Sequence, residues 1–140
     1  MLVSEIMVRD PITVSPATRV EELARLMRDR SISSVVLSTG GKPVGIVTER
    51  DLVHRVLAEG RDPTAFTAGD ISTRQIVSVS ADASIEDALT SMTLHRIRRL
   101  VVVDDAKRLV GILTSDDIAR NIKGMTAEIA KAYLSLVARG

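Results

Sequence analysis

Residues 45–52 read GIVTERDL and residues 111–118 read GILTSDDI, so one pattern occurs twice in a chain of 140 residues. In each copy a glycine precedes a threonine by three positions, and an aspartate follows that threonine by three positions. The repetition extends upstream, where apolar residues correspond between the copies: Val20, Leu23, Ala24 and Met27 match Ile85, Ala88, Leu89 and Met92. An internal repeat constrains the whole fold, and two copies of about 60 residues cover nearly the entire chain.

Each copy predicts the same order of elements, β-α-β-β-α. A short extended segment, 12–14 or 76–79, precedes a helix whose apolar residues recur at i, i+3, i+4 and i+7. Thr18-x-x-Glu21 and Ser84-x-x-Asp87 are the predicted capping boxes of these helices. Two β-rich runs and a second helix complete each copy. The runs are 35–37 and 44–47, then 100–103 and 109–113, with turns at Gly40-Gly41 and Asp104-Asp105.

The predicted fold class is α+β: two β-α-β-β-α repeats related by a pseudo-two-fold axis, with sheets packed together and a C-terminal helix added. A single copy of about 60 residues buries its apolar surface poorly, and pairing of the copies solves this. The predicted domains are a first repeat over 1–60, a linker over 61–70, a second repeat over 71–123 and a C-terminal helix over 124–140. In the last segment the helically spaced apolar residues are Ile129, Tyr133, Leu136 and Val137.

The composition argues against several function classes. Lys and Arg number 19 and Asp and Glu number 18, a balance that makes nucleic acid and anionic lipid poor partners. One Tyr, one Phe and no Trp leave no platform for stacking bases, and the absence of Cys excludes thiol chemistry. No run approaches the ~20 apolar residues of a membrane span, and no secretory pattern opens the chain. We therefore expect a soluble cytoplasmic protein with no membrane or nucleic-acid partner.

The repeated motif places a hydroxyl and a carboxylate at a strand-to-helix junction. Thr48 and Thr114 occupy predicted N-cap positions, where free backbone N–H groups and the helix dipole favour an anion such as phosphate. Asp51 and Asp117 follow on the first helical turn, where a carboxylate can accept hydrogen bonds from a ribose diol. The same residues equally make a capping box that needs no ligand. The motif alone leaves both interpretations open.

In combination with this spacing, the duplicated G-h-x-T-x-x-D motif resembles a tandem pair of cystathionine-β-synthase (CBS) domains, also called a Bateman module. Residues 6–14, which read IMVRDPITV, and residues 71–79 are also typical of that family, and the resemblance covers residues 1–123. It implies binding of an adenosine nucleotide (AMP, ADP or ATP) as a regulatory ligand in up to two clefts between the copies, and pairing of modules through their helices into a homodimer. The implied contacts are the ribose with Asp51 and Asp117, the phosphate with Thr48 and Thr114, and the base with Thr13, Val14, Ser78 and Val79.

The two copies differ where the middle strand begins. The first has Ser33 and Ser34 and the second has Arg98 and Arg99. The resemblance implies that basic residues at these positions face ligand phosphates, a role to which the guanidinium group is well suited. We therefore expect unequal sites, with Arg98 and Arg99 favouring one phosphorylated ligand. The alternative is a solvated basic turn.

The leading hypothesis is a non-catalytic regulatory module, a ligand sensor in which nucleotide binding biases two arrangements of the copies. Its output would pass through an effector protein or through self-association. The alternative is a structural or interaction scaffold whose T-x-x-D boxes are helix caps only. An enzyme is not expected, because no nucleophile, base or metal constellation is present, and His54 and His95 are interpreted as surface residues. The residues leave S-adenosylmethionine and guanine nucleotides open as ligands.

Overall fold

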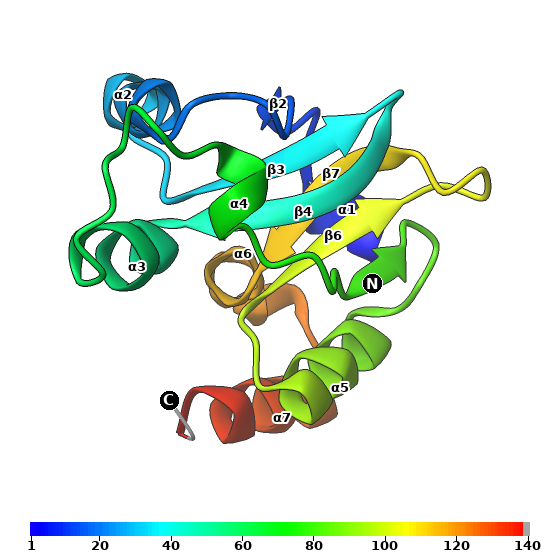
Figure 1. The fold of residues 1–140 in the computed structure, drawn as a ribbon. Coiled ribbons are helices and arrows are strands. Elements are labelled where there is room, and N and C mark those ends of the chain that lie inside the picture. Colours follow the sequence, from blue (N-terminus) through cyan, green and yellow to red (C-terminus); the bar gives the residue numbers. More distant parts are fainter. Residues whose placement is uncertain (139–140) are drawn as a thin grey trace. The chain divides into compact units, whose positions relative to one another are not determined.

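The computed structural model describes residues 1–138, which form two compact units. One unit consists of residues Pro11–Ile76 (Figure 1). The other combines Met1–Asp10 with the chain from Val77 onward. The first ten residues thus belong to the unit of the second repeat, and the segment after residue 60 belongs to the unit of the first repeat.

The Pro11–Ile76 unit contains a three-stranded sheet in the order β2-β3-β4, with β2 parallel and β4 antiparallel to β3. Its elements are β2 (Thr13–Val14), α2 (Val20–Arg30), β3 (Ser34–Thr39), β4 (Lys42–Thr48), α3 (Glu49–Asp51), the π-helix η1 (Leu52–Leu57) and α4 (Ala68–Ile71). The predicted β-α-β-β-α order is therefore confirmed in this repeat. The hairpin turn between β3 and β4 lies at Gly40 and Gly41, whose φ angles of +59° and +80° favour glycine.

The core of this unit lies between α2 and the sheet. Val20, Leu23 and Met27 of α2 are buried against Val35 and Val47 of the strands, as the helical spacing of the apolar residues predicts. The hydrophobic face of the helix thus fixes the position of β4, which carries Thr48 at its end.

The capping box predicted at Thr18 and Glu21 is wrong. Helix α2 begins at Val20 without a side-chain cap. The backbone N–H groups of Val20 and Glu21 donate instead to the carbonyl oxygens of Phe66 and Pro63, each at 3.0 Å. Carbonyl oxygens of a distant segment therefore accept hydrogen bonds from the free N–H groups at the start of α2, so these groups need no side-chain cap.

That distant segment was predicted as a linker, yet part of it is regular structure. Thr67 caps α4 in a reciprocal capping box with Asp70: the N–H of Thr67 donates to Asp70 Oδ2 at 2.9 Å, and the N–H of Asp70 donates to Thr67 Oγ1 at 3.3 Å. Ala68 and Ile71 of α4 are fully buried in the core beneath α2. Phe66, Ala68 and Ile71 of this segment therefore complete the core of the first repeat.

The second unit contains a four-stranded sheet in the order β1-β7-β6-β5. Its elements are α1 (Val3–Ile6), β1 (Val8–Arg9), β5 (Ser78–Ser80), α5 (Ile85–His95), β6 (Arg99–Val103), β7 (Leu109–Thr114), α6 (Ser115–Arg120), the 3₁₀-helix η2 (Ile122–Gly124) and α7 (Ala127–Ala138). Strand β5 is parallel to β6, and β7 is antiparallel to both β6 and β1. The N-terminal residues therefore add an edge strand to this sheet.

Helix α5 forms the core of the second unit together with the C-terminal helix. Ser84 caps α5 by accepting a hydrogen bond from the N–H of Asp87 at 3.0 Å, which is one half of the predicted capping box. Helix α7 lies beside α5 (Figure 1), with Ile129 and Leu136 buried against Leu89. The predicted C-terminal helix therefore packs on its own chain. Its last two predicted positions, 139 and 140, lie outside the described residues.

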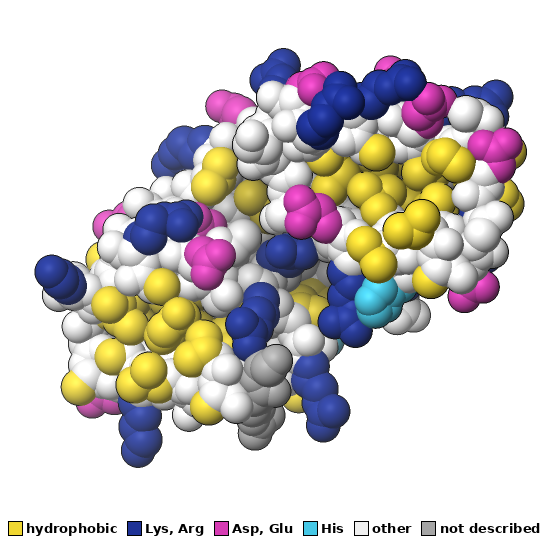
Figure 2. All heavy atoms as spheres, turned by 90° about the vertical axis from the view of Figure 1, so that its left-hand side faces the viewer, with side chains coloured by type: hydrophobic (Ala, Val, Ile, Leu, Met, Phe, Trp, Pro, Cys, Tyr) yellow, Lys and Arg dark blue, Asp and Glu magenta, His cyan; other side chains and the backbone are white. Residues whose placement is uncertain are grey.

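The surface mixes charged and apolar side chains. Figure 2 shows basic and acidic side chains interspersed over one face, with hydrophobic side chains gathered in patches between them. Within residues 1–138, no helix combines the length and the apolar character required to cross a membrane.

Candidate functional site

The first T-x-x-D motif forms a complete capping box at the start of α3. Thr48 ends β4, and its N–H donates to Asp51 Oδ2 at 2.8 Å. In return the N–H of Asp51 donates to Thr48 Oγ1 at 3.3 Å, while the Thr48 hydroxyl donates to Asp51 Oδ2 at 3.2 Å. The Asp51 side chain is therefore held against the backbone of Thr48, with only 13% of it exposed.

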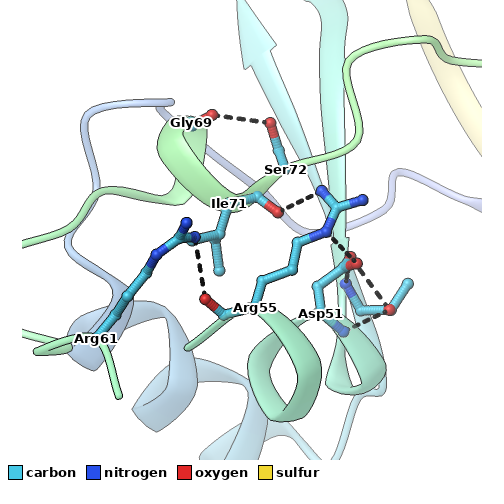
Figure 3. Close-up of polar contacts among 7 residues, drawn as sticks. Asp51, Arg55, Arg61, Gly69, Ile71 and Ser72 are labelled. Carbon is cyan, nitrogen blue, oxygen red and sulfur yellow. Dashed lines mark hydrogen bonds and ion pairs between the residues drawn. The ribbon is translucent and has the colours of Figure 1, made fainter. Parts of the chain in front are cut away.

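Arg55 connects this box to α4 (Figure 3). Its Nε lies 3.6 Å from Asp51 Oδ1, and its Nη1 donates to the carbonyl oxygen of Ile71 at 2.9 Å. Arg61 Nη1 donates to the carbonyl oxygen of Arg55 at 3.0 Å. Arg55 thus orients the Asp51 carboxylate and links the second helix of the repeat to α4.

The second motif repeats this geometry at the start of α6. The N–H of Thr114 donates to Asp117 Oδ2 at 2.9 Å, and the N–H of Asp117 donates to Thr114 Oγ1 at 3.1 Å. Arg120 forms an ion pair with Asp117 Oδ1. Asp117 is 4% exposed, so this carboxylate is more deeply buried than that of Asp51.

Both aspartates therefore have one oxygen bonded to a threonine N–H and the other oriented by an arginine. A carboxylate oxygen has two lone pairs, so Oδ1 of Asp51 or Asp117 can accept a ribose hydroxyl while it remains near its arginine. The threonine N–H, in contrast, is already bonded within the box. The arrangement suits recognition of a hydroxyl donor.

Sequence reasoning did not identify Arg55 and Arg120 as partners of the aspartates. A detectable signal existed: each arginine follows its aspartate by four or three positions, the spacings at which side chains meet on a helix. Each is about half exposed or more, so these ion pairs orient the carboxylates and contribute little stability.

Arg98 and Arg99 have different surroundings. Arg99 begins β6 opposite Thr114, and its Nε is buried without a hydrogen-bond partner. The carbonyl oxygen of Arg98 accepts the N–H of Ser115 at 2.9 Å, which places the backbone of Arg98 beside the first turn of α6. The guanidinium of Arg98, however, donates to the carbonyl oxygen of Val137 at the end of α7, at 3.4 Å.

The remaining predicted contacts lie on the short parallel strands. Thr13 and Val14 pair with Val36 and Leu37, and Ser78 and Val79 occupy the matching strand positions in the other unit. Thr13 and Ser78 are exposed, whereas Val14 and Val79 are half-buried. Each pair therefore offers both a polar and an apolar surface.

The two histidines are exposed and lie in different units. The His95 ring contacts the carbonyl oxygen of Ser91 at 2.9 Å, within its own helix. Residues 1–138 contain no cluster of three or more His, Asp or Glu side chains that could hold a metal ion.

Comparison with known proteins identifies the family to which this chain belongs. The CBS domain model matches the chain twice, at residues 3–58 and 68–124. The chain is 41% identical to an uncharacterized protein of Methanopyrus kandleri over 117 residues, which are 83% of this chain and 60% of that protein. It is 39% identical to hypoxic response protein 1 of Mycobacterium tuberculosis over 100 residues, 71% of this chain and 69% of that protein.

Enzymes also contain a similar segment. The inosine-5′-monophosphate dehydrogenase of Methanocaldococcus jannaschii is 36% identical over 135 residues, which are 96% of this chain but 26% of the enzyme. The resemblance is therefore to a minor part of that enzyme.

Solved structures with a similar fold support the same family assignment. The structure of hypoxic response protein I with two coordinated zinc ions has a TM-score of 0.77 and 35% identity, and the match covers 86% of this chain and 98% of that one. The CBS domain pair of protein MJ0100 in complex with 5′-methylthioadenosine and S-adenosyl-L-methionine has a TM-score of 0.78 and 31% identity, with coverage of 89% and 97%. With two family matches that span most of its length and a fold shared with these pairs, the chain belongs to the CBS domain family and carries two CBS domains.

Proposed function

We propose that this chain is a non-catalytic regulatory module that binds an adenosine-containing ligand at its duplicated T-x-x-D motifs. The observation that carries the proposal is that Asp51 and Asp117 have the same surroundings. Each carboxylate is largely buried and contacts one threonine and one arginine. Support comes from a relative of the same family, 31% identical, whose structure contains S-adenosylmethionine and methylthioadenosine. AMP, ADP and ATP are the other candidate ligands.

In this proposal Asp51 and Asp117 accept ribose hydroxyls, Thr48 and Thr114 lie next to the phosphate or its equivalent, and the base contacts Thr13-Val14 or Ser78-Val79. The sites are unequal. Arg99 has an unpaired Nε beside Thr114, whereas Ser34 occupies the matching position beside Thr48. Arg98 reaches a phosphate only if it leaves the carbonyl oxygen of Val137. Ligand binding would then act through self-association into a homodimer or through an effector protein.

A second candidate function is a ligand-free scaffold. The observation that favours it is that both carboxylates already satisfy a capping box. In that case Asp51 and Asp117 matter only as helix caps, and their removal lowers stability by about 0.5–2 kcal/mol without changing any ligand response.

The chain provides a matched control for this choice. Thr67 and Asp70 form a third T-x-x-D capping box, which lies outside the duplicated motif. We expect AMP, ATP or S-adenosylmethionine at millimolar concentration to raise the melting temperature of ligand-free protein, since a ligand that binds only the folded state stabilises it. Asp51→Ala and Asp117→Ala should reduce that rise, and Asp70→Ala should preserve it. A response that is absent in the wild type, or equal in all three variants, would refute the proposal.

A further inference from the structure

A cavity of about 230 Å³ lies toward the turn of the β3–β4 hairpin. Its walls come from the loop before α2, from the hairpin, and from α4 with the residues after it, so its whole lining belongs to the Pro11–Ile76 unit. Thr39 pairs with Lys42 at this end of the hairpin, whereas Ser34 pairs with Thr48 at the opposite end. The cavity is therefore separate from the T-x-x-D motif.

The other unit has a methionine at the position that borders this space. Ser72 and Met7 are matching residues, each next to the glycine that opens a T-x-x-D motif. Val110 precedes one of these glycines and is partly buried against the core cluster that contains Met7. Its counterpart Val44 lines the cavity and is 39% exposed. The shorter serine thus leaves a space whose apolar wall lacks a partner.

The polar groups of the cavity are held together by one carbonyl oxygen. Ser72 Oγ and Arg74 Nη2 both donate to the carbonyl oxygen of Gly69, each at 3.2 Å, and Figure 3 shows the contact of Ser72. The apolar part of the lining consists of Pro16, Leu37 and Val44. An apolar cavity with a few fixed polar groups is the usual form of a small-molecule site.

The charge of Arg74 indicates the kind of ligand. Within residues 1–138 its guanidinium forms no ion pair with an acidic side chain. A guanidinium carries five N–H donors, and a carboxylate can accept two of them at once. Arg74 can therefore keep its hydrogen bond to Gly69 while other N–H groups bind an anion.

The volume limits the size of that ligand. An apolar cavity of about 150 Å³ holds benzene, which has six carbon atoms. In proportion, a cavity of about 230 Å³ has room for roughly nine non-hydrogen atoms. A nucleotide is far larger, whereas a carboxylate on a single ring or on a short branched chain has this size.

We propose that this cavity is a separate ligand site that binds a small apolar carboxylate. The hydrocarbon body lies against Leu37 and Val44, and the carboxylate pairs with Arg74. The site goes beyond the proposed nucleotide function and does not depend on it.

NMR titration of the full, nitrogen-15-labelled chain with benzoate and with 4-methylpentanoate tests the proposal. A ligand of so few atoms can reach millimolar affinity, so titration to about 20 mM is sufficient. We expect saturable shifts of the backbone amides of Leu37, Val44 and Ser72 with at least one of the two carboxylates. Benzamide is the uncharged control for benzoate and should bind at least tenfold more weakly than the carboxylate that binds, because it cannot form the ion pair.

Two pairs of variants separate charge from space. Arg74→Gln should weaken carboxylate binding at least tenfold, whereas Arg25→Gln, which removes an exposed arginine of α2 in the same unit, should bind like the wild type. Ser72→Met should abolish binding because the longer side chain fills the cavity, and Ser72→Ala should retain it. Melting curves will verify that each variant folds.

Several results would overturn the proposal. One is the absence of saturable shifts with both carboxylates, and another is an equal affinity of Ser72→Met and wild type. Benzamide that binds as tightly as the carboxylates would show that the charge of Arg74 is not recognised. Shifts confined to Thr48 and Asp51 would place the probe at the T-x-x-D motif instead.

Discussion

Met7 lies so close to Gly111 that a Cβ atom on residue 111 would be 2.6 Å from the methionine sulfur. The matching pair in the other unit is Ser72 and Gly45, where a Cβ would be 3.0 Å from the serine hydroxyl oxygen. The glycine that opens each T-x-x-D motif therefore allows a neighbouring segment to lie against the strand. Met7 fills this space in one unit, and the shorter Ser72 leaves it partly empty in the other.

The first prediction concerns Gly111. We expect Gly111→Ala to lower the free energy of unfolding by about 1–3 kcal/mol, because the added methyl group would displace Met7 or the backbone of Val8. Urea denaturation measures the change. Gly124→Ala is the control, since the nearest atom to its added Cβ would be 3.5 Å away, an ordinary contact. Equal stability of Gly111→Ala and wild type would contradict the expectation.

The second prediction concerns the space beside Ser72. A cavity of about 230 Å³ there is bordered by Pro16, Leu37 and Val44. We expect Ser72→Met to fill it as Met7 does in the other unit and to raise the unfolding free energy by about 0.5–1 kcal/mol. The lost hydrogen bond to the carbonyl oxygen of Gly69 is partly offset, because Arg74 also donates to that oxygen at 3.2 Å.

Ser72→Ala separates the two contributions of this substitution. It removes the hydroxyl without filling the cavity, so it should be less stable than wild type. Thermal melts of the three proteins give the comparison. A Ser72→Met variant that melts below Ser72→Ala would rule out the filling.

The third prediction concerns Arg55. Its removal should increase hydrogen exchange in α4, because the guanidinium donates to the carbonyl oxygen of Ile71 while it also faces Asp51. We expect Arg55→Ala to lower the free energy of unfolding by about 1 kcal/mol, a value reduced for the partial exposure of the arginine. Arg25→Ala, which loses only an exposed ion pair within α2, serves as control and should leave α4 unchanged. Unchanged exchange of residues 68–71 in Arg55→Ala would argue against the coupling.

The fourth prediction concerns pH. Hydrogen bonds from the backbone N–H of Thr67, and then from its side chain, hold the pKa of Asp70 below its ordinary value. A carboxylate with a lowered folded-state pKa contributes stability above its unfolded pKa, near 3.9, and that contribution is lost as the pH falls through the folded-state pKa. Wild type should therefore lose more stability than Asp70→Asn between pH 5 and pH 2, as denaturant melts would measure. Parallel curves for the two proteins would contradict this role of Asp70.

Local patterns in the sequence identified much of the fold. Helical spacing gave the buried faces of α2 and α5, and the turn at Gly40 and Gly41 was predicted from residue type alone. The start of α2 was predicted wrongly because its N–H groups bond to Phe66 and Pro63, which no local pattern indicates. The change from α- to π-helix at Leu52 was also missed.

At the candidate site, too, the local pairings could be predicted from the sequence and the long-range contacts could not. The pairing of each threonine with its aspartate follows from a three-residue spacing, so sequence reasoning could propose it. The contact of Arg98 with Val137 joins residues far apart in the chain, and the tie between Arg55 and Ile71 depends on where α4 packs. Such contacts require the tertiary structure.

The path of the chain has a mechanical consequence. Residues 1–10 and the chain from Val77 onward form one unit, so the polypeptide leaves that unit once, builds the other from Pro11–Ile76, and returns. Tension applied at both ends of the chain is therefore borne first by the unit that contains β1 and α7. The inserted unit, Pro11–Ile76, bears no tension until β1 separates from β7. Under a pulling force the two repeats should rupture in a fixed sequence, the one that holds the ends before the one inserted between them.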